Sequence, residues 1–168
     1  MKKPVPYIIW VLFAVGLVVI IIGSIQMKSN VNRSTIQITE ETIYKNVNDL
    51  EDVLLKTSKD KYENNIEEIC FIFENNTDQE FTFGSQYQLE KFENGKWYQL
   101  LPDEQERLWT LEGHRLKPNS IRKETLNLNW IYGNYFEDGT YRIVKGIHFR
   151  RSNGDLDMFY LTAEFKIT

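Results

Sequence analysis

The sequence has little cysteine and histidine, and it lacks the common catalytic motifs. Cys70 is the single cysteine, so an intrachain disulfide is excluded. The two histidines, His114 and His148, have no cysteine or second histidine at metal-ligand spacing, whereas a zinc site needs three or four ligands. No nucleophile elbow, H-E-x-x-H pattern, C-x-x-C pair or phosphate-binding loop occurs. We therefore expect no metal, no cofactor and no enzymatic activity.

An excess of positive charge is also missing. The chain has 20 basic and 24 acidic residues, a net charge of −4. Without Lys2 and Lys3, which precede a long apolar run, the rest of the chain carries −6. Nucleic-acid-binding surfaces need clustered Lys and Arg, and anionic lipid headgroups attract basic segments. We therefore expect neither a nucleic acid nor an anionic lipid surface as a partner.

The apolar run near the N-terminus is the most informative feature that is present. No charged residue lies between Lys3 and Lys28, and nearly every residue from Tyr7 to Ile25 is apolar. At 1.5 Å per residue, these about nineteen residues form a helix of roughly 29 Å, close to the hydrocarbon thickness of a bilayer. Residues 1–27 are therefore predicted to be an uncleaved signal anchor with one membrane span. The basic residues before the run favour a cytoplasmic N-terminus and an extracytoplasmic C-terminal part.

A cleaved signal peptide is the alternative for the same segment. Its apolar region usually has 7–15 residues and ends at small residues of the A-x-A type. The run here is longer, and Gly23-Ser24-Ile25-Gln26 does not have that form. Both alternatives put the remaining chain outside the cytoplasmic membrane.

The rest of the chain divides into a polar segment and a strand-rich part. Residues 28–50 mix β-branched alternation with acidic residues, and we predict a polar tether there. From 51 to 168, runs with strand periodicity alternate with turn signals and no long amphipathic helix occurs. About seven strands are expected, which indicates an all-β sandwich. Asn94-Gly95 favours a two-residue type I′ hairpin, because both residues tolerate positive φ.

Three local patterns refine the predicted sandwich. The run from Ile69 to Phe73 alternates but is apolar on both sides, so we expect a central strand with a buried, inert Cys70. In the strand 121–129, Leu126, Leu128 and Trp130 are expected to share one face. The last strand, 158–167, places five apolar residues on one face: Phe159, Leu161, Ala163, Phe165 and Ile167.

A tyrosine corner narrows the sandwich to an immunoglobulin-like fold. In that fold a tyrosine near the start of strand F hydrogen-bonds back to the backbone, two residues before a cysteine position. Tyr141 in Asp138-Gly139-Thr140-Tyr141 fits this role, with Ile143 at the cysteine position. Trp97 is the candidate for the core indole of the fold.

Seven short motifs follow one another in a fixed order: Asn75-Asn76, Phe83-Gly84, Tyr87-Gln88-Leu89-Glu90, Gly95-Lys96-Trp97-Tyr98, Leu116-Lys117-Pro118, Tyr132-Gly133 and Gly139-Thr140-Tyr141-Arg142-Ile143. With these motifs the chain resembles the bacterial immunoglobulin-like domain found in membrane and surface proteins of Gram-positive bacteria, over roughly residues 52–168. The resemblance implies a fold and an exported setting, but no activity and no catalytic residues.

Aromatic residues in loops are the candidate binding residues. Trp130, Tyr135 and Phe136 lie in one aromatic stretch, and Trp109 lies in the long 102–116 connection. Exposed aromatics bind protein partners or sugars, whereas buried ones pack the corner around Tyr141. Both alternatives stay open at this stage.

The remaining polar groups suggest no site. His114 is expected to be solvated in a loop, and His148 to lie on a strand surface. The segment Asn153–Asp157 has alternate oxygen ligands like a fragment of a calcium loop, but a hairpin turn is favoured because the chain turns directly into an apolar strand.

The sequence thus predicts a non-catalytic, membrane-anchored interaction module of the bacterial cell envelope. Its partner would be a protein or a cell-wall polymer. A sensory or regulatory ectodomain is the alternative, and an accessory domain of an envelope hydrolase is a third reading.

Overall fold

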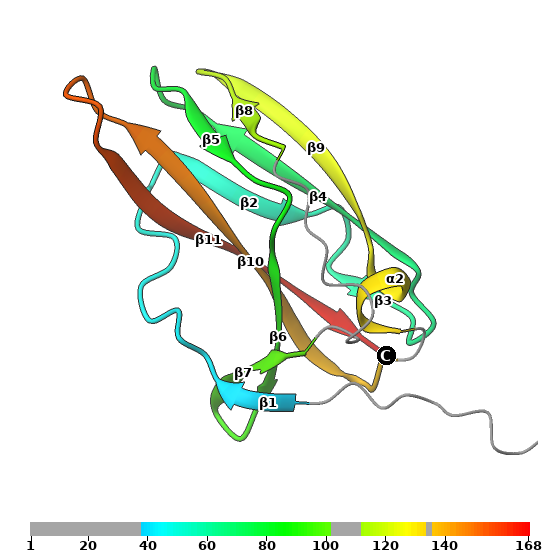
Figure 1. Ribbon diagram of the computed structural model, residues 1–168. Helices are drawn as coiled ribbons and strands as arrows, with labels where there is room; N and C mark the ends of the chain where they lie inside the picture. The colour runs from blue at the N-terminus through cyan, green and yellow to red at the C-terminus, as the bar shows by residue number, and fades with distance from the viewer. Residues whose placement is uncertain (1–37, 102–111, 134–135) are drawn as a thin grey trace, which may run out of the picture. The chain divides into compact units, whose positions relative to one another are not determined.

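Two sheets pack face to face (Figure 1), and all their strand pairs are antiparallel except β11 with β3, which is parallel. The computed structural model describes residues 38–101, 112–133 and 136–168. The smaller sheet has the order β2 (Val53–Thr57), β4 (Glu68–Asn75), β9 (Ser120–Asn127). The larger sheet has eight strands. Six of them follow in the order β1 (Ile38–Glu41), β7 (Lys96–Leu100), β6 (Gln88–Glu93), β10 (Gly139–Arg150), β11 (Leu156–Ile167) and β3 (Lys61–Tyr62). The other two extend the sheet from β10: β5 (Phe81–Phe83) pairs with β10, and β8 (His114–Leu116) pairs with β5.

The sandwich prediction is confirmed, but the number of strands is higher than expected. The described residues form eleven strands rather than about seven, since short strands such as β1, β3 and β8 lie in segments expected to be tether or loop. Strands β10 and β11 form the longest hairpin, with paired residues from Gly139 and Ile167 to Arg150 and Leu156.

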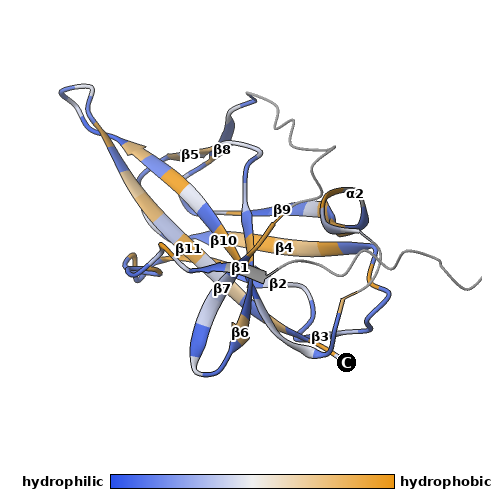
Figure 2. Ribbon diagram, turned by 60° about the horizontal axis from the view of Figure 1, so that its bottom comes forward, coloured by the Kyte–Doolittle hydropathy of each residue, from blue (hydrophilic) through white to orange (hydrophobic). Residues whose placement is uncertain are grey.

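The core lies between the two inner faces. On β11 the five residues from Phe159 to Ile167 predicted to share a face do point inward, and Leu161, Phe165 and Ile167 are fully or nearly fully buried. Hydrophobic and hydrophilic residues alternate along β10 and β11 in Figure 2. Burial of this inner face, at about 25 cal/mol per Å² of apolar surface, stabilises the sandwich without a disulfide.

The tyrosine corner is present. The Tyr141 hydroxyl donates a 2.8 Å hydrogen bond to the carbonyl of Glu137, four residues upstream. Its ring is buried and stacks on Phe165 with centroids 5.8 Å apart. The Asn94-Gly95 turn is also as predicted, because both residues have positive φ, 50° and 81°.

Strand β9 ends earlier than the alternation predicts. A short helix, α2 (Leu128–Tyr132), replaces the end of the predicted strand. Leu128, Ile131 and Tyr132 are all buried, and their i, i+3, i+4 spacing suits one face of a helix rather than a strand. Gly133 follows with φ of 83°, a left-handed conformation that ends the helix.

Two predictions of burial are wrong. Only one face of β4 is fully covered, so Cys70 is half-buried on the outer face of the smaller sheet rather than in the core. Trp97 is also half-exposed: it lies on the outer side of the larger sheet, with the Arg142 guanidinium 4.4 Å from its ring centroid. No indole of the described residues belongs to the buried core.

The segment predicted as a tether is partly built into the domain. Residues 38–50 run from the β7 edge across the outer face of the larger sheet (Figure 1). At its far end the Asn48 amide NH donates to the Tyr160 carbonyl, and its side-chain oxygen accepts from the Thr162 amide, each at 2.8 Å. Asn48 therefore caps the outer edge of β11.

The membrane span predicted for Tyr7–Ile25 lies outside the described residues. Within the residues that are described, no helix is long and apolar enough to cross a bilayer.

Candidate functional site

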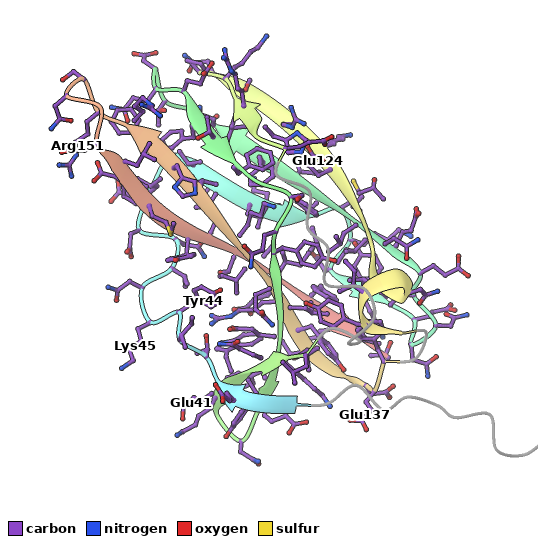
Figure 3. The ribbon with its side chains drawn as sticks, in the orientation of Figure 1. Glu41, Tyr44, Lys45, Glu124, Glu137 and Arg151 are labelled. Carbon is purple, nitrogen blue, oxygen red and sulfur yellow. The ribbon has the colours of Figure 1, made fainter. Side chains whose placement is uncertain are left out.

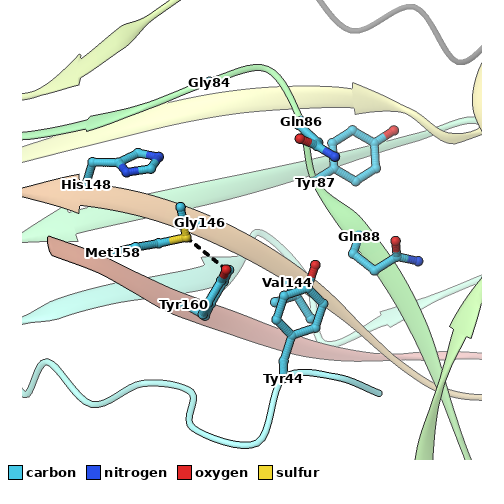
Figure 4. A pocket seen from close by; sticks show the side chains of 10 residues that line it. All are labelled: Tyr44, Gly84, Gln86, Tyr87, Gln88, Val144, Gly146, His148, Met158 and Tyr160. Atoms are coloured by element: carbon cyan, nitrogen blue, oxygen red, sulfur yellow. Dashed lines mark hydrogen bonds between the residues drawn. The ribbon is translucent and has the colours of Figure 1, made fainter. Parts of the chain in front are cut away.

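A groove of about 340 Å³ crosses the outer face of the larger sheet (Figure 4). Its floor is β10, where Val144, Gly146 and His148 alternate outward while the intervening residues point into the protein. We call this hollow the sheet groove. Its position follows from the pleat of β10, since outward residues recur every second position.

Gly146 contributes no side chain to the floor of the groove. It is paired with Tyr160 of β11, and the Tyr160 ring lies over the missing side chain. A Cβ at position 146 would lie 3.5 Å from this ring, an ordinary van der Waals contact. A glycine inside a strand often marks such a close approach, and a cross-strand aromatic compensates for the lost packing.

Tyr44 forms one wall together with Tyr160. The two rings are tilted by 57° with centroids 4.8 Å apart. Figure 3 shows Tyr44 directed toward the sheet and Lys45 directed away from it. Thr42 fixes this arrangement: its hydroxyl accepts a 3.1 Å bond from the Tyr44 amide and donates a 2.6 Å bond to Glu90. Burial is the main cause that raises the pKa of Tyr44, so the phenol stays neutral at physiological pH.

The opposite wall comes from the turn between β5 and β6. Gln86 is exposed there, and Gln88 is half-buried with its amide nitrogen donating to the carbonyls of Leu89 and Leu100, each at 2.9 Å. Tyr87 lies between them with its ring buried. The Gln86 amide is therefore the polar group of this wall that is directed to solvent.

A buried lysine holds this wall in place from below. Lys145 of β10 is 2% exposed, and its ammonium donates to the carbonyls of Gly84 and Gln86 at 2.6 and 2.7 Å. The ammonium also lies 5.3 Å from the Phe83 ring centroid. Desolvation is the main cause that lowers the pKa of Lys145 to about 8.

A buried ion pair supports the end of the groove near Tyr44. Arg142 and Glu90 are 2.7 Å apart, with side chains 6% and 0% exposed. Thr42 donates to the Glu90 carboxylate, and Trp97 covers the guanidinium. Because both charges are desolvated, the pair depends on these added contacts. Segment 42–44 and the sheet are thus tied together by polar contacts.

Charge is absent from the sheet groove but present beside it. None of the ten described residues that line the groove is Asp, Glu, Lys or Arg. A second hollow of about 580 Å³ shares His148 and is lined by Glu80, Arg115 and Arg150. The sheet groove therefore borders a second hollow that is lined by charged side chains.

The lining residues include one histidine, His148, whose Cα partners on the neighbouring strands are Met158 and Thr82. Within the described part of the chain, no cluster of three His, Cys, Asp or Glu residues could hold a metal ion.

Of the aromatic residues predicted as binding candidates, Phe136 is the one whose side chain is described, and it does not line the groove. Phe136 is 0% exposed and packs edge-on against Tyr141 at 5.9 Å, so it belongs to the core alternative. Trp109 and Tyr135 lie outside the described residues. Only the backbone of Trp130, in α2, is described.

Two further sequence expectations can be compared with the structure. His114 is not solvated in a loop: it starts β8, packs on Phe83, and its Nδ1 accepts a 3.0 Å bond from Arg122. The Asn153–Asp155 segment is a hairpin turn, as favoured, with the Asn153 amide group donating to Asp155 at 2.7 Å and Gly154 at φ 95°.

Sequence reasoning missed the groove residues, although one signal was available. Gly146 interrupts an otherwise regular strand, and Tyr160 occupies the outward position of the next strand. Nothing in the sequence could place Tyr44 beside them, because its segment is held by a contact between Thr42 and Glu90, which are 48 residues apart.

Comparison with known proteins supports the fold and the family. A family model described as a bacterial Ig-like domain matches residues 49–166. No curated protein matches. One solved structure, the ASH/PapD-like domain of human CEP192, is 10% identical, covers 79% of this chain and 97% of its own, and has a TM-score of 0.31. Since the family model spans more than half of the chain, and the strands and the tyrosine corner agree with it, the chain belongs to the bacterial Ig-like domain family.

Proposed function

We propose that this protein is a non-catalytic interaction module, displayed outside the cytoplasmic membrane, which binds its partner in the sheet groove. The single observation that carries the proposal is the groove itself. Its walls combine partly exposed aromatic rings with an exposed amide, and its floor is a rigid central strand.

The construction of the groove supports a binding role. Its floor is the central strand β10, which is hydrogen-bonded to neighbours on both sides. One wall is held by Lys145 and the other by Thr42. Rigid elements that hold a few polar and aromatic groups in a hollow are typical of ligand sites.

The display outside the membrane is supported by the N-terminal sequence. The apolar run from Tyr7 to Ile25 is long enough for one span, and Lys2 and Lys3 favour a cytoplasmic N-terminus. The family is bacterial, so the proposed location is the bacterial cell envelope. With such an anchor, the segment that supplies Tyr44 would connect the membrane directly to the groove.

Protease protection tests the location. A tag after Thr168 of the full chain should be removed by protease added to intact protoplasts, while a cytoplasmic marker protein stays intact. A tag that survives until the cells are lysed would contradict the display outside the membrane.

Site-directed photo-cross-linking tests the binding face. A photoreactive residue replaces Gln86 in the full chain, expressed in its native membrane, and the matched control carries it at Tyr98, a half-exposed position on β7 outside the groove. We expect adducts from position 86 that are absent at position 98. Equal adducts, or none, from the two positions would contradict the groove as the binding face.

A further inference from the structure

We propose that the ligand of the sheet groove is a neutral carbohydrate chain, bound through its sugar rings. This inference rests on the proposed function, because it names the chemical class of the partner for the same groove. It is argued from charge, side-chain chemistry and the hydrogen bonding of the floor strand.

The charge of the groove excludes an ionic ligand. In the whole sequence 26% of the residues are charged, yet the described lining of the groove has no Asp, Glu, Lys or Arg. A phosphate, carboxylate or ammonium group would be desolvated there without a counter-charge, which is costly. The ligand is therefore polar but uncharged.

The side chains match the surface of a sugar. A pyranose ring has apolar C–H faces and a rim of hydroxyl groups, so it needs flat apolar surfaces together with hydrogen-bonding groups beside them. Tyr44 and Tyr160 supply the rings and two phenol groups, of which the Tyr160 hydroxyl donates to the Met158 sulfur at 2.8 Å. Gln86 supplies an exposed amide that can both donate and accept. Aromatic side chains with a polar tip commonly serve such mixed surfaces.

The backbone of the floor argues against an extended peptide. A peptide that adds to a sheet needs a strand edge with free N–H and C=O groups. Strand β10 is paired with β11 over Gly139–Arg150 and with β6 over Thr140–Val144. At the wall, Asn48 occupies the edge of β11 at Tyr160 and Thr162. Strand β10 is also paired with β5 at His148 and Phe149, so among the described residues only 145–147 lack a second strand partner at the groove, a stretch too short for an added peptide strand.

The dimensions suit a short stretch of a polymer. The groove volume of about 340 Å³ is at the lower end for ligand sites, which run from roughly 300 to 1,000 Å³. It is a hollow on the surface of the sheet, so it would hold a short part of a longer chain (Figure 4). A small part of such a chain would contact the two tyrosines at any time.

Titration calorimetry with defined oligosaccharides tests the inference. The full chain, purified in detergent micelles, is titrated with neutral oligomers of glucose and of N-acetylglucosamine, and with a uronic-acid oligomer of similar length as the charged comparison. We expect saturable binding of at least one neutral oligomer and weaker binding of the uronic-acid oligomer. Tyr160→Ala should weaken the neutral ligand about tenfold and Gln86→Ala about fivefold, corresponding to one aromatic contact and one hydrogen bond.

Tyr98→Ala is the matched control, because it removes a half-exposed tyrosine outside the groove. It should leave the affinity unchanged, and melting curves should show that all three variants are folded. Gln86 lies in an exposed turn, so Gln86→Ala should fold. This variant still tests the inference if Tyr160→Ala unfolds.

The two proposals fail in different ways. If no neutral oligomer binds, or the uronic-acid oligomer binds better, or Tyr98→Ala weakens binding as much as Gln86→Ala, the carbohydrate inference is wrong. If the cross-links from position 86 persist in that case and prove to be with a protein, the groove remains the binding face with another ligand. If no neutral oligomer binds and the cross-links from position 86 are also absent, both the carbohydrate inference and the proposed function are wrong.

Discussion

The buried Lys145 predicts an unusual dependence of stability on pH. Its ammonium is held under the β5–β6 turn, and desolvation lowers its pKa from 10.5 to about 8. Between these two pH values the unfolded chain binds a proton that the native protein has released. The free energy of unfolding therefore rises with pH in this window, whereas below pH 8 both states are protonated and the penalty is constant.

The magnitude follows from the same shift. A shift from 10.5 to about 8 corresponds to about 3 kcal/mol when the whole window is crossed. This is an upper limit, because the carbonyls of Gly84 and Gln86 stabilise the ammonium and oppose the loss of its proton. By pH 9 only part of the window has been crossed, and a gain of about 1 kcal/mol over pH 7 is expected.

Above about pH 10 the trend should reverse. Burial raises the pKa of Tyr44, Tyr87, Tyr132 and Tyr141, in the case of Tyr141 to about 12. The unfolded chain loses these protons near pH 10 while the native protein keeps them, so the free energy of unfolding falls as pH rises. Lys91 acts in the same direction, because hydrogen bonds to Glu137 and Glu93 outweigh its desolvation and raise its pKa to about 12. Stability should thus be highest between pH 9 and 10.

Urea unfolding followed by tryptophan fluorescence from pH 7 to 11 measures this curve. Lys145→Met should remove the rise between pH 7 and 9, whatever its effect on absolute stability at pH 7. Lys56→Met, which changes a lysine with a 52% exposed side chain on the smaller sheet, is the control and should keep the rise. A flat or falling curve in the unmodified protein, or a rise that persists in Lys145→Met, would refute the reasoning.

Three further predictions concern polar contacts that hold the sandwich. Tyr141→Phe should cost about 1–2 kcal/mol of unfolding free energy, since it removes only the bond to Glu137; an unchanged denaturation midpoint would show that this bond does not contribute. Arg142→Met should cost about 3–5 kcal/mol because it isolates the buried Glu90, and adding Glu90→Met should recover most of the loss in a double-mutant cycle; no recovery would refute the pairing. Asn75→Ala should cost about 3 kcal/mol, because this fully buried amide joins two turns, and a change in melting temperature of less than a degree would contradict that role.

The sequence was sufficient for features that depend on local patterns. The Asn94-Gly95 hairpin follows from two residues that tolerate positive φ, and the inward face of β11 follows from strict alternation. The tyrosine corner was predictable because donor and acceptor are four residues apart. In each case the information lies within a few positions of the chain.

Features that depend on distant contacts could not be predicted in this way. Cys70 and Ile72 appear core-like by hydropathy, but they lie on the outer face of the smaller sheet and are half-exposed. Trp97 is held outside by Arg142, a residue of another strand. Lysine is usually a surface residue, but Lys145 is buried because two backbone carbonyls accept its hydrogen bonds.

The path of residues 38–50 has a practical consequence for producing the protein. A fragment cut at residue 49, where the family match begins, would lack β1 and Asn48. It would leave the outer edge of β11 bare around Tyr160 and expose the Arg142–Glu90 pair to water. Unpaired strand edges form hydrogen bonds with other chains, so such a fragment should aggregate. A fragment that begins before Ile38 should stay monomeric.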